Sequence, residues 1–399
     1  MTDSNTVDAP ESRFWALAQA GIVAVAFSLL LAGTNAVNPL LPVYREVLRL
    51  EPFVLSLTFV FYVTVLVIAL VVLARPSLTR HATGLLLAAL AVALGADALL
   101  SLSTEWSVLV GRMVAGVAGG LATGAAAALV VAAIGARGRA LSATGNLVGA
   151  VVGTAASQIV IELRGSAATH EVFLWHGIAV LVVLVAASIV LRVRRAPNRL
   201  ALATVAGVPE KLRLRLSDAR YLATGCVAWA GVSVAIVLGA TVFAELDSPL
   251  VRAVGPALML GSSAAGQLAS PHLARVVPWM SGVVLLSVGA LGIAAGAVVD
   301  SPPLSLAGFA ALGIGIGISY RAGLVALSRG ASPARQGALS SAYGAITYAV
   351  AAAVVLTVGA VGNVTGVVPA AIGALVVTAV FGLVLLPFAP RLRDTVDRV

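Results

Sequence analysis

Three charged side chains lie inside long apolar segments of the sequence, where a charge is costly. They are Asp97, Arg112 and Arg321. A charge at the centre of a membrane helix costs about 2.5–3.5 kcal/mol on insertion scales, so such a group is expected to face the protein interior. A guanidinium in that position is suited to hold an anionic group or to respond to a nearby proton. Positions 97 and 112 are equidistant from the turn near 104–105, so a structural Asp97–Arg112 ion pair is the alternative.

Polar and aromatic side chains in the same segments are candidates for contact with a small molecule. They are Asn35, Asn38, Tyr62, Trp229, Tyr320, Arg321 and Tyr343. Each of these residues also has an alternative role that involves no substrate. The tyrosines could serve in packing, and the amides could form hydrogen bonds between helices. Arg321 could contact carbonyl groups at a helix end. The acids Glu162, Glu245 and Asp247 end their segments, so we expect them to be solvated rather than to carry a proton.

Several kinds of chemistry find no support in the sequence. The one lysine, Lys211, follows no glycine-rich loop, and Gly313–Gly317 lies inside an apolar segment with no strand before it. The four histidines, His81, His170, His176 and His272, lack metal-binding spacing, and Cys226 has no partner for a disulfide. No nucleophile–base set stands out. We therefore expect no catalytic residues, cofactor, metal or nucleic acid.

Composition identifies the elements that position these residues. The chain has 399 residues, of which 60% are hydrophobic and 10% charged, against roughly 25% charged in an average soluble domain. A membrane-spanning helix takes roughly 20 apolar residues and satisfies its own backbone, which predicts an all-α membrane protein with twelve transmembrane helices. The predicted spans are 14–36, 53–74, 83–103, 106–134, 140–162, 172–193, 219–244, 250–270, 280–299, 304–328, 336–361 and 366–388.

The 25 basic residues divide unevenly between the two ends of these spans. Nineteen lie on the side that holds both termini, two lie inside spans, and only Arg45, Arg49, Arg164 and Arg252 lie on the opposite side. By the positive-inside rule, both termini are predicted to be cytoplasmic. The net charge of +9 is thus explained by membrane topology, and the predicted location is the cytoplasmic membrane.

Two short repeats divide the chain into halves. Residues 74–80 match 269–275 at four of seven positions, and 137–142 resemble 335–340 at nearly the same offset. This duplication predicts two parallel, pseudo-symmetric six-helix bundles. The predicted regions are a tail at 1–13, a bundle at 14–195, a linker at 196–218, a bundle at 219–389 and a tail at 390–399.

With these features the sequence resembles the major facilitator superfamily. The most specific match is Arg112-x-x-x-Gly116-x-x-Gly119, and Asn35–Pro42 is similar to the family's first helix. Gly145, Gly149 and Gly153 resemble its glycine-rich antiporter motif, although Thr154 replaces the expected proline. The resemblance gives these glycines, with Arg80 and Arg275 of the repeated loops, roles in packing and conformational change. Residues 75–81 lack the acid that helps lock the family's outward-open state.

The resemblance implies a secondary transporter that moves a small organic molecule by alternating access. It favours proton-coupled efflux by a monomer in contact with membrane lipids. Because the candidate residues include Arg112 and Arg321, with Asp97 as the one deep acid, we expect a neutral or anionic substrate, a class that includes amphiphilic molecules. Proton symport, facilitated uptake and lipid transport remain alternatives. So does a non-transporting scaffold or receptor built on the same fold.

Overall fold

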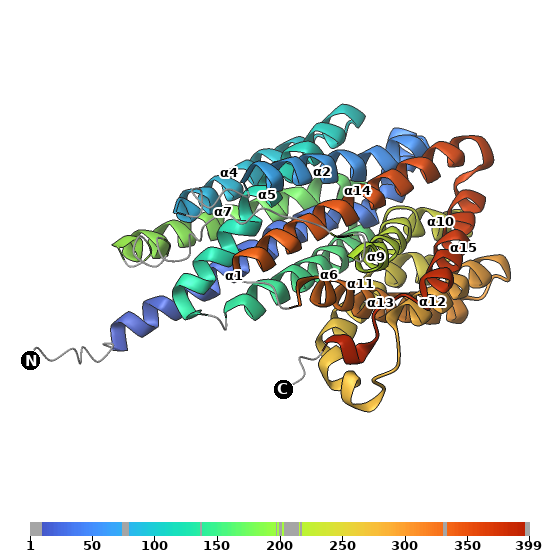
Figure 1. The fold of residues 1–399 in the computed structure, drawn as a ribbon. Coiled ribbons are helices and arrows are strands. Elements are labelled where there is room, and N and C mark those ends of the chain that lie inside the picture. Colours follow the sequence, from blue (N-terminus) through green and yellow to red (C-terminus); the bar gives the residue numbers. More distant parts are fainter. Residues whose placement is uncertain are drawn as a thin grey trace, which may run out of the picture.

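The computed structural model describes residues 10–73, 80–135, 138–196, 198, 202, 215, 218–329 and 333–395. This part of the chain contains helices and no strands, which confirms the predicted all-α fold. The described residues form twelve long helices, one short helix, α10, and two 3₁₀ turns, and Figure 1 shows how the helices are arranged. Their bounds are α1 Pro10–Leu48, α2 Pro52–Leu73, α4 Ala82–Ser101, α5 Glu105–Ile134, α6 Gly138–Arg164, η2 Gly165–Ala167, α7 Ala168–Val193, α9 Ala219–Val237, α10 Gly239–Glu245, α11 Pro249–Val276, α12 Gly282–Val298, α13 Pro302–Ser328, α14 Pro333–Thr365, α15 Val367–Leu385 and η4 Leu392–Thr395.

The helices follow the predicted spans, with two differences. The first helix, expected to end near residue 36, continues through Pro39 and Pro42 to Leu48. Each proline removes one backbone hydrogen bond, but Leu40, Leu41 and Tyr44 are almost fully buried along this stretch, and their packing offsets that cost. The seventh span is broken at Leu238, which separates α9 from α10.

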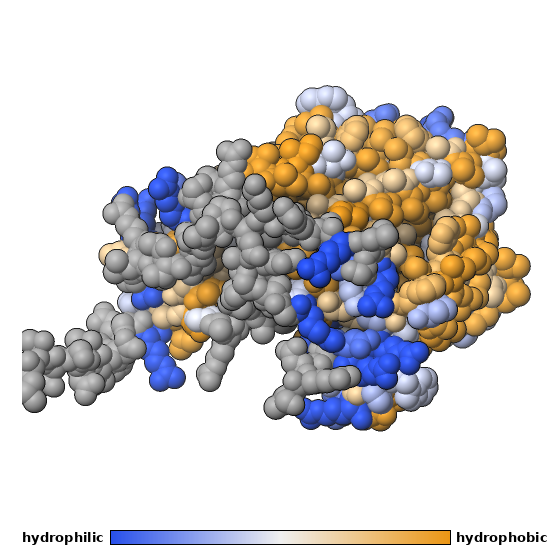
Figure 2. Space-filling view, in the orientation of Figure 1, coloured by the Kyte–Doolittle hydropathy of each residue, from blue (hydrophilic) through white to orange (hydrophobic). Residues whose placement is uncertain are grey.

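The molecular surface is that of a protein surrounded by lipid. Nine segments of the described chain are long and apolar enough to cross a membrane, and one of them, Val148–Val193, contains parts of both α6 and α7. Figure 2 shows a broad hydrophobic surface. Exposed apolar side chains on α15 include Val377, Val380, Phe381 and Val384.

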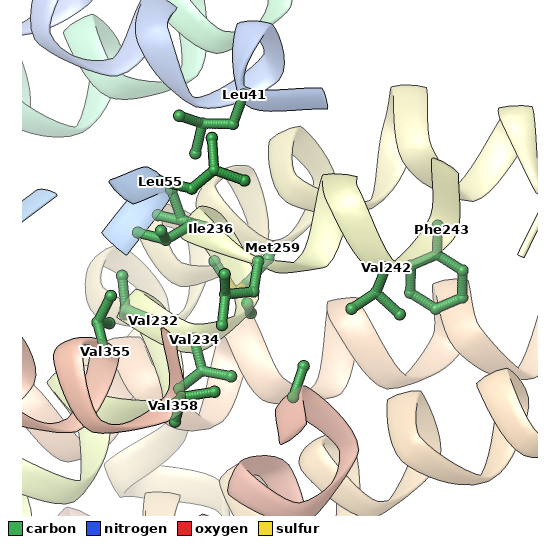
Figure 3. Close-up of a cluster of buried hydrophobic side chains, with 14 of the residues drawn as sticks. Leu41, Leu55, Val232, Val234, Ile236, Val242, Phe243, Met259, Val355 and Val358 are labelled. Carbon is green, nitrogen blue, oxygen red and sulfur yellow. The ribbon is translucent and has the colours of Figure 1, made fainter. Parts of the chain in front are cut away.

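Because successive spans alternate in direction, the start of α1 and the end of α15 lie on one side of the molecule, here called the termini side. The opposite side is called the far side. Towards the far side, one hydrophobic core contains side chains from both bundles, such as Leu41 and Leu55 beside Ile236 and Val358 (Figure 3). Towards the termini side the cores are separate. One core consists of residues of α1, α4, α5 and α7 together with Leu202. Two small cores belong to the second bundle. The bundles are therefore closed against each other on the far side.

Polar contacts also join the bundles on the far side. Arg45 of α1 pairs with Glu245 of α10, and Arg252 of α11 lies 4.0 Å from Glu162 of α6. The Asn363 side chain of α14 accepts from the Phe53 amide at 2.9 Å and donates to Glu51 at 2.9 Å. Glu162 and Glu245, expected to be free solvated acids, are thus parts of the contact between bundles.

Parts of the predicted division of the chain lie outside the described residues. This applies to most of the linker 196–218, to positions 1–9, and, among the repeated segments, to residues 74–79 and 137. The predicted tail at 390–399 is in part folded. The Leu392 amide donates to the Met280 carbonyl at 2.9 Å, and Ser281 donates to the Pro390 carbonyl at 3.0 Å. These bonds hold η4 against the ends of α11 and α13.

Candidate functional site

The position of Arg112 follows from the local sequence of α5. Thr104 and Ser107 cap the start of this helix reciprocally, each side chain accepting from the backbone amide of the other. One turn after Arg112, a Cβ on Gly116 would lie 2.6 Å from the Tyr62 carbonyl oxygen of α2. Only glycine permits this approach, so the two helices come close enough for Arg112 to reach backbone groups of its neighbours.

Arg112 is buried, with 2% of its surface exposed. Its Nε donates to the Thr58 carbonyl of α2 at 3.0 Å, and Nη1 donates to the Thr34 carbonyl of α1 at 2.7 Å. The guanidinium also lies 4.5 Å from the centre of the Tyr62 ring, which is attractive for a cation. No carboxylate of the described residues pairs with it. Arg112 is a buried positive charge held by carbonyl dipoles and a ring.

Asp97 pairs with His176, so the Asp97–Arg112 ion pair that the sequence offered as the alternative is not formed. Nδ1 of His176, on α7, lies 2.9 Å from Oδ1 and 2.8 Å from Oδ2 of Asp97, on α4. On the other side of the ring, Nε2 lies 2.9 Å from the Leu29 carbonyl of α1. Equal distance from the turn places residues 97 and 112 at similar depth, but it does not fix the direction in which each side chain points.

A group of aromatic side chains occupies the second bundle. Trp229 of α9 lies with its ring centre 4.3 Å from that of Tyr348 and 5.8 Å from that of Tyr320. Tyr320 of α13 lies 5.0 Å from Tyr343 of α14, whose hydroxyl donates to the Tyr320 carbonyl at 3.1 Å. Tyr343 is fully buried, whereas Trp229, Tyr320 and Tyr348 are partly exposed. We call these four residues the aromatic cluster.

The aromatic cluster meets the Arg112 region across the boundary between the bundles. Tyr348 packs on the group formed by Tyr62, Val63 and Leu66 of α2 with Ala352 of α14. Tyr62 in turn lies under the Arg112 guanidinium. A cation from the first bundle and aromatic faces from the second are therefore connected through side chains in contact, and we treat this junction as the candidate substrate site.

The remaining predicted contact residues bond to backbone or to each other rather than to the residues of the candidate substrate site. Arg321 is partly exposed and donates to the Gln267 carbonyl of α11 at 2.9 Å, the carbonyl contact considered as the alternative. Asn35 donates to the Leu31 carbonyl of its own helix at 2.8 Å, and Asn38 donates to the Asn35 side chain at 3.4 Å. Both amides therefore bond within α1, and the hydrogen bonds between helices that the sequence offered as the alternative are not formed by these donors.

The predicted packing glycines lie at close helix contacts where the structure describes them. Gly119 faces Leu66 and Tyr62 of α2, whereas Gly149 and Gly153 of α6 face backbone atoms of Ser28 and Ala32 in α1. The surroundings of Gly145 lie outside the described residues. A side chain at Gly149 or Gly153 would push α6 away from α1.

Arg80 and Arg275, which the repeated loops suggested as conformational residues, are both exposed on the termini side. Arg80 lines a cavity of about 380 Å³ between the ends of α4 and α7, together with His81, Arg192, Arg195 and Asn198. Within the described chain no three His, Cys, Asp or Glu side chains come together as a metal site.

The chain belongs to the Major Facilitator Superfamily, whose family model matches residues 23–356. It is accordingly a secondary transporter with that fold, built to move a small molecule across a membrane, and not an enzyme. No curated protein matches its sequence significantly.

Solved structures with similar folds are transporters. The crystal structure of the nucleoside transporter NupG is 11% identical with a TM-score of 0.70, over 94% of this chain and 98% of that one. A bacterial homologue of the human lysosomal transporter Spinster, in an inward-facing and unoccupied conformation, is 11% identical with a TM-score of 0.64, over 95% of this chain and 96% of that one.

Sequence reasoning missed one member of these sites, His176, and one buried tyrosine of α1, Tyr44, that interacts electrostatically with Arg112. His176 was considered only as a metal ligand, and Tyr44 was not considered at all. Tyr44 is fully buried, and its hydroxyl has no hydrogen-bond partner among the described residues. The preference of buried imidazole rings for a carboxylate partner would have directed attention to His176 and Asp97.

Proposed function

We propose that this transporter carries a small neutral or anionic organic molecule, bound at the junction of Arg112 and the aromatic cluster, in exchange for protons. It acts as a monomer in the plasma membrane, with both termini in the cytoplasm. The direction is export, which the motif around Arg112 and the glycines of α6 favour. Uptake by proton symport is the rival, since similar folds include a nucleoside transporter.

One observation supports this proposal above the others: Arg112 is a buried cation without a paired carboxylate in the described chain. A buried charge is stabilised by a partner of opposite sign far more than a charge in water is. An anionic or strongly dipolar substrate supplies such a partner when the bundles rearrange. The aromatic faces next to it suit a planar or apolar part of the same molecule.

Far-side closure supports a transport cycle of the alternating-access type. Among the described residues, the bundles share their large core and their polar contacts on the far side, and a smaller apolar group joins α2 to α14 next to the candidate site. Alternating access requires a second state, in which the bundles are closed on the termini side and open on the far side. Rocking of one bundle against the other would carry the Arg112–aromatic junction between the two.

The test is flux in reconstituted vesicles, with and without an imposed pH gradient. The panel contains nucleosides, organic anions and amphiphilic antibiotics, each loaded inside or outside. We expect at least one compound to move faster when protons flow in the opposite direction. Flux that ignores the gradient would exclude proton coupling, faster flux along the proton gradient would indicate symport, and no flux at all would favour a scaffold or receptor.

Two matched variants connect the flux to the site. Arg112→Ala removes the buried cation, and we expect flux to fall by at least about tenfold, equivalent to about 1.4 kcal/mol. Arg195→Ala removes an exposed arginine that has no bonded partner in the described chain, and it should retain flux. Equal flux from the two variants would refute the assigned role of Arg112.

A further inference from the structure

His176 occupies a position in which both ring nitrogens face oxygen acceptors. Nδ1 lies 2.8 Å and 2.9 Å from the two carboxylate oxygens of Asp97, and Nε2 lies 2.9 Å from the Leu29 carbonyl. A carbonyl oxygen and an ionised carboxylate accept hydrogen bonds but cannot donate them. Both contacts are satisfied together only when the pair holds one extra proton, as imidazolium with carboxylate or as neutral imidazole with carboxylic acid.

Removing that proton leaves one nitrogen lone pair directed at an oxygen. The charge-assisted bond to Asp97 is the stronger of the two, so the remaining N–H stays on Nδ1. Nε2 then faces the Leu29 carbonyl without a hydrogen, and the attraction between α7 and α1 becomes repulsion. The proton therefore decides whether α1 is held against the α4–α7 pair.

The titratable groups around His176 and Asp97 are engaged elsewhere, so the effect of the proton is confined to this pair. Asp97 is 6% exposed, and the His176 side chain is 10% exposed. On α7, His170 faces the Ser101 carbonyl at the far side and Glu171 pairs with Arg164. On α5, Arg112 bonds to backbone carbonyls. Among the described residues no further charged or titratable side chain on α1, α4, α5 or α7 contacts the pair.

Gly33 shows how closely α1 fits the ring. A Cβ on Gly33 would lie 2.6 Å from Nε2 and 2.8 Å from Nδ1 of His176. The imidazole thus packs on bare backbone of α1. One residue further on, the Thr34 carbonyl accepts from Arg112 at 2.7 Å, so a displacement of α1 at His176 reaches the candidate substrate site through the same helix.

We propose that His176 and Asp97 form the proton-binding site of the transport cycle: one bound proton holds α1 against α4 and α7, and its release frees α1 and disturbs the Thr34–Arg112 bond. This inference rests on the proposed proton coupling. The proton moves as H⁺ between solvent and the imidazole–carboxylate pair, and no other bond is formed or broken.

The test uses protons alone, on the full-length protein in lipid nanodiscs. Spin labels are placed on exposed positions of α1 and α7, with Leu17→Cys and Ile189→Cys, after the one cysteine is removed by Cys226→Ser. The distance is measured between about pH 5 and pH 9, which brackets the ordinary range of histidine. We expect one short distance at acid pH and a longer population that dominates at alkaline pH. A label pair on α4 and α7, Ala91→Cys with Ile189→Cys, should keep one distance throughout.

Variants and a direct readout complete the test. His176→Gln and Asp97→Asn should abolish the change of the α1–α7 distance with pH. His170→Gln should keep this change, because His170 lies on the same helix but contacts only the Ser101 carbonyl. Nitrogen NMR of ring-labelled histidine should show a proton on Nε2 of His176 at acid pH, whether the second proton lies on Nδ1 or on Asp97, and a proton on Nδ1 alone at alkaline pH. This readout stands if a variant fails to fold. A neutral His176 at every pH, with Asp97 ionised, or a response that survives His176→Gln, would overturn the proposal. A pH response with flux that ignores the gradient would refute the proposed coupled transport and leave the proton site standing.

Discussion

Arg45 near the end of α1 forms an ion pair with Glu245, the last residue of α10, and thereby joins the two bundles on the far side. Both side chains are about one-third exposed, at 30% and 34%. A pair of this kind is worth about 0.2–1 kcal/mol. Its contribution is small, but it is present in only one of the two states that alternating access requires.

Glu245→Gln should therefore shift the population towards a state open on the far side. Ser56, which is fully buried and packs against Gly359 of α14, reports this state as Ser56→Cys in a Cys226→Ser background. We expect the rate of maleimide labelling to rise about 2–5-fold, the ratio that corresponds to about 0.4–1 kcal/mol. Glu171→Gln breaks the Arg164–Glu171 pair inside one bundle and should leave the rate unchanged. An equal rise in both variants would show that the effect is not specific to the contact between bundles.

Gly33→Ala should destabilise the protein, because the added methyl group collides with the His176 ring. Overpacking of this kind costs about 1–3 kcal/mol, and thermal unfolding in detergent measures it. Gly21→Ala lies on the same helix and has open space around the new methyl group, so it should be neutral or more stable by up to about 1 kcal/mol. If the two substitutions behave alike, the imidazole does not pack on α1 as described.

Trp229→Leu should weaken transport while the fold is retained. Trp229, in ring contact with Tyr348 and Tyr320, offers an aromatic face to the substrate in the proposed site. An aromatic contact contributes about 0.5–1.5 kcal/mol, so loss of this contact with the substrate should lower apparent affinity about 2–10-fold. Trp175→Leu is the control, because that ring is 61% exposed on the surface of α7. The apparent affinity of each variant is measured from the concentration dependence of flux, with the compound of the panel that is transported fastest. Unchanged affinity in Trp229→Leu would show that the aromatic cluster is not part of the substrate site.

The two sides of the molecule can be assigned in intact cells. Val299→Cys lies on the far side and Arg391→Cys on the termini side, and both positions are exposed. In a Cys226→Ser background, a membrane-impermeant maleimide should label the first and spare the second until the membrane is opened. The reverse pattern would contradict the prediction that both termini are cytoplasmic.

The sequence predicted the twelve helices because apolar length is a local property. It also predicts which residues lie at similar depth along neighbouring helices, since depth follows from distance to a turn. Rotation of each helix about its own axis was not predictable. Asp97 and Arg112 share a depth but face different neighbours, and His176, far away in the chain, supplies the partner that no spacing indicates. The break at Leu238 and the continuation of α1 through two prolines likewise depend on contacts between helices.

Four basic residues lie on the far side, although most basic residues of the chain lie on the termini side. Ion pairs with acidic residues explain most of these exceptions. Of Arg45, Arg49, Arg164 and Arg252, all but Arg49 have an acidic partner. The partner of Arg164 lies in its own bundle, whereas the partner of Arg45 lies in the second. During synthesis the ribosome completes the whole first bundle before Glu245 exists. In the proposed orientation, with both termini cytoplasmic, Arg45 crosses the membrane before its partner is made, and formation of the Arg45–Glu245 pair becomes a late step of biogenesis that requires the second bundle.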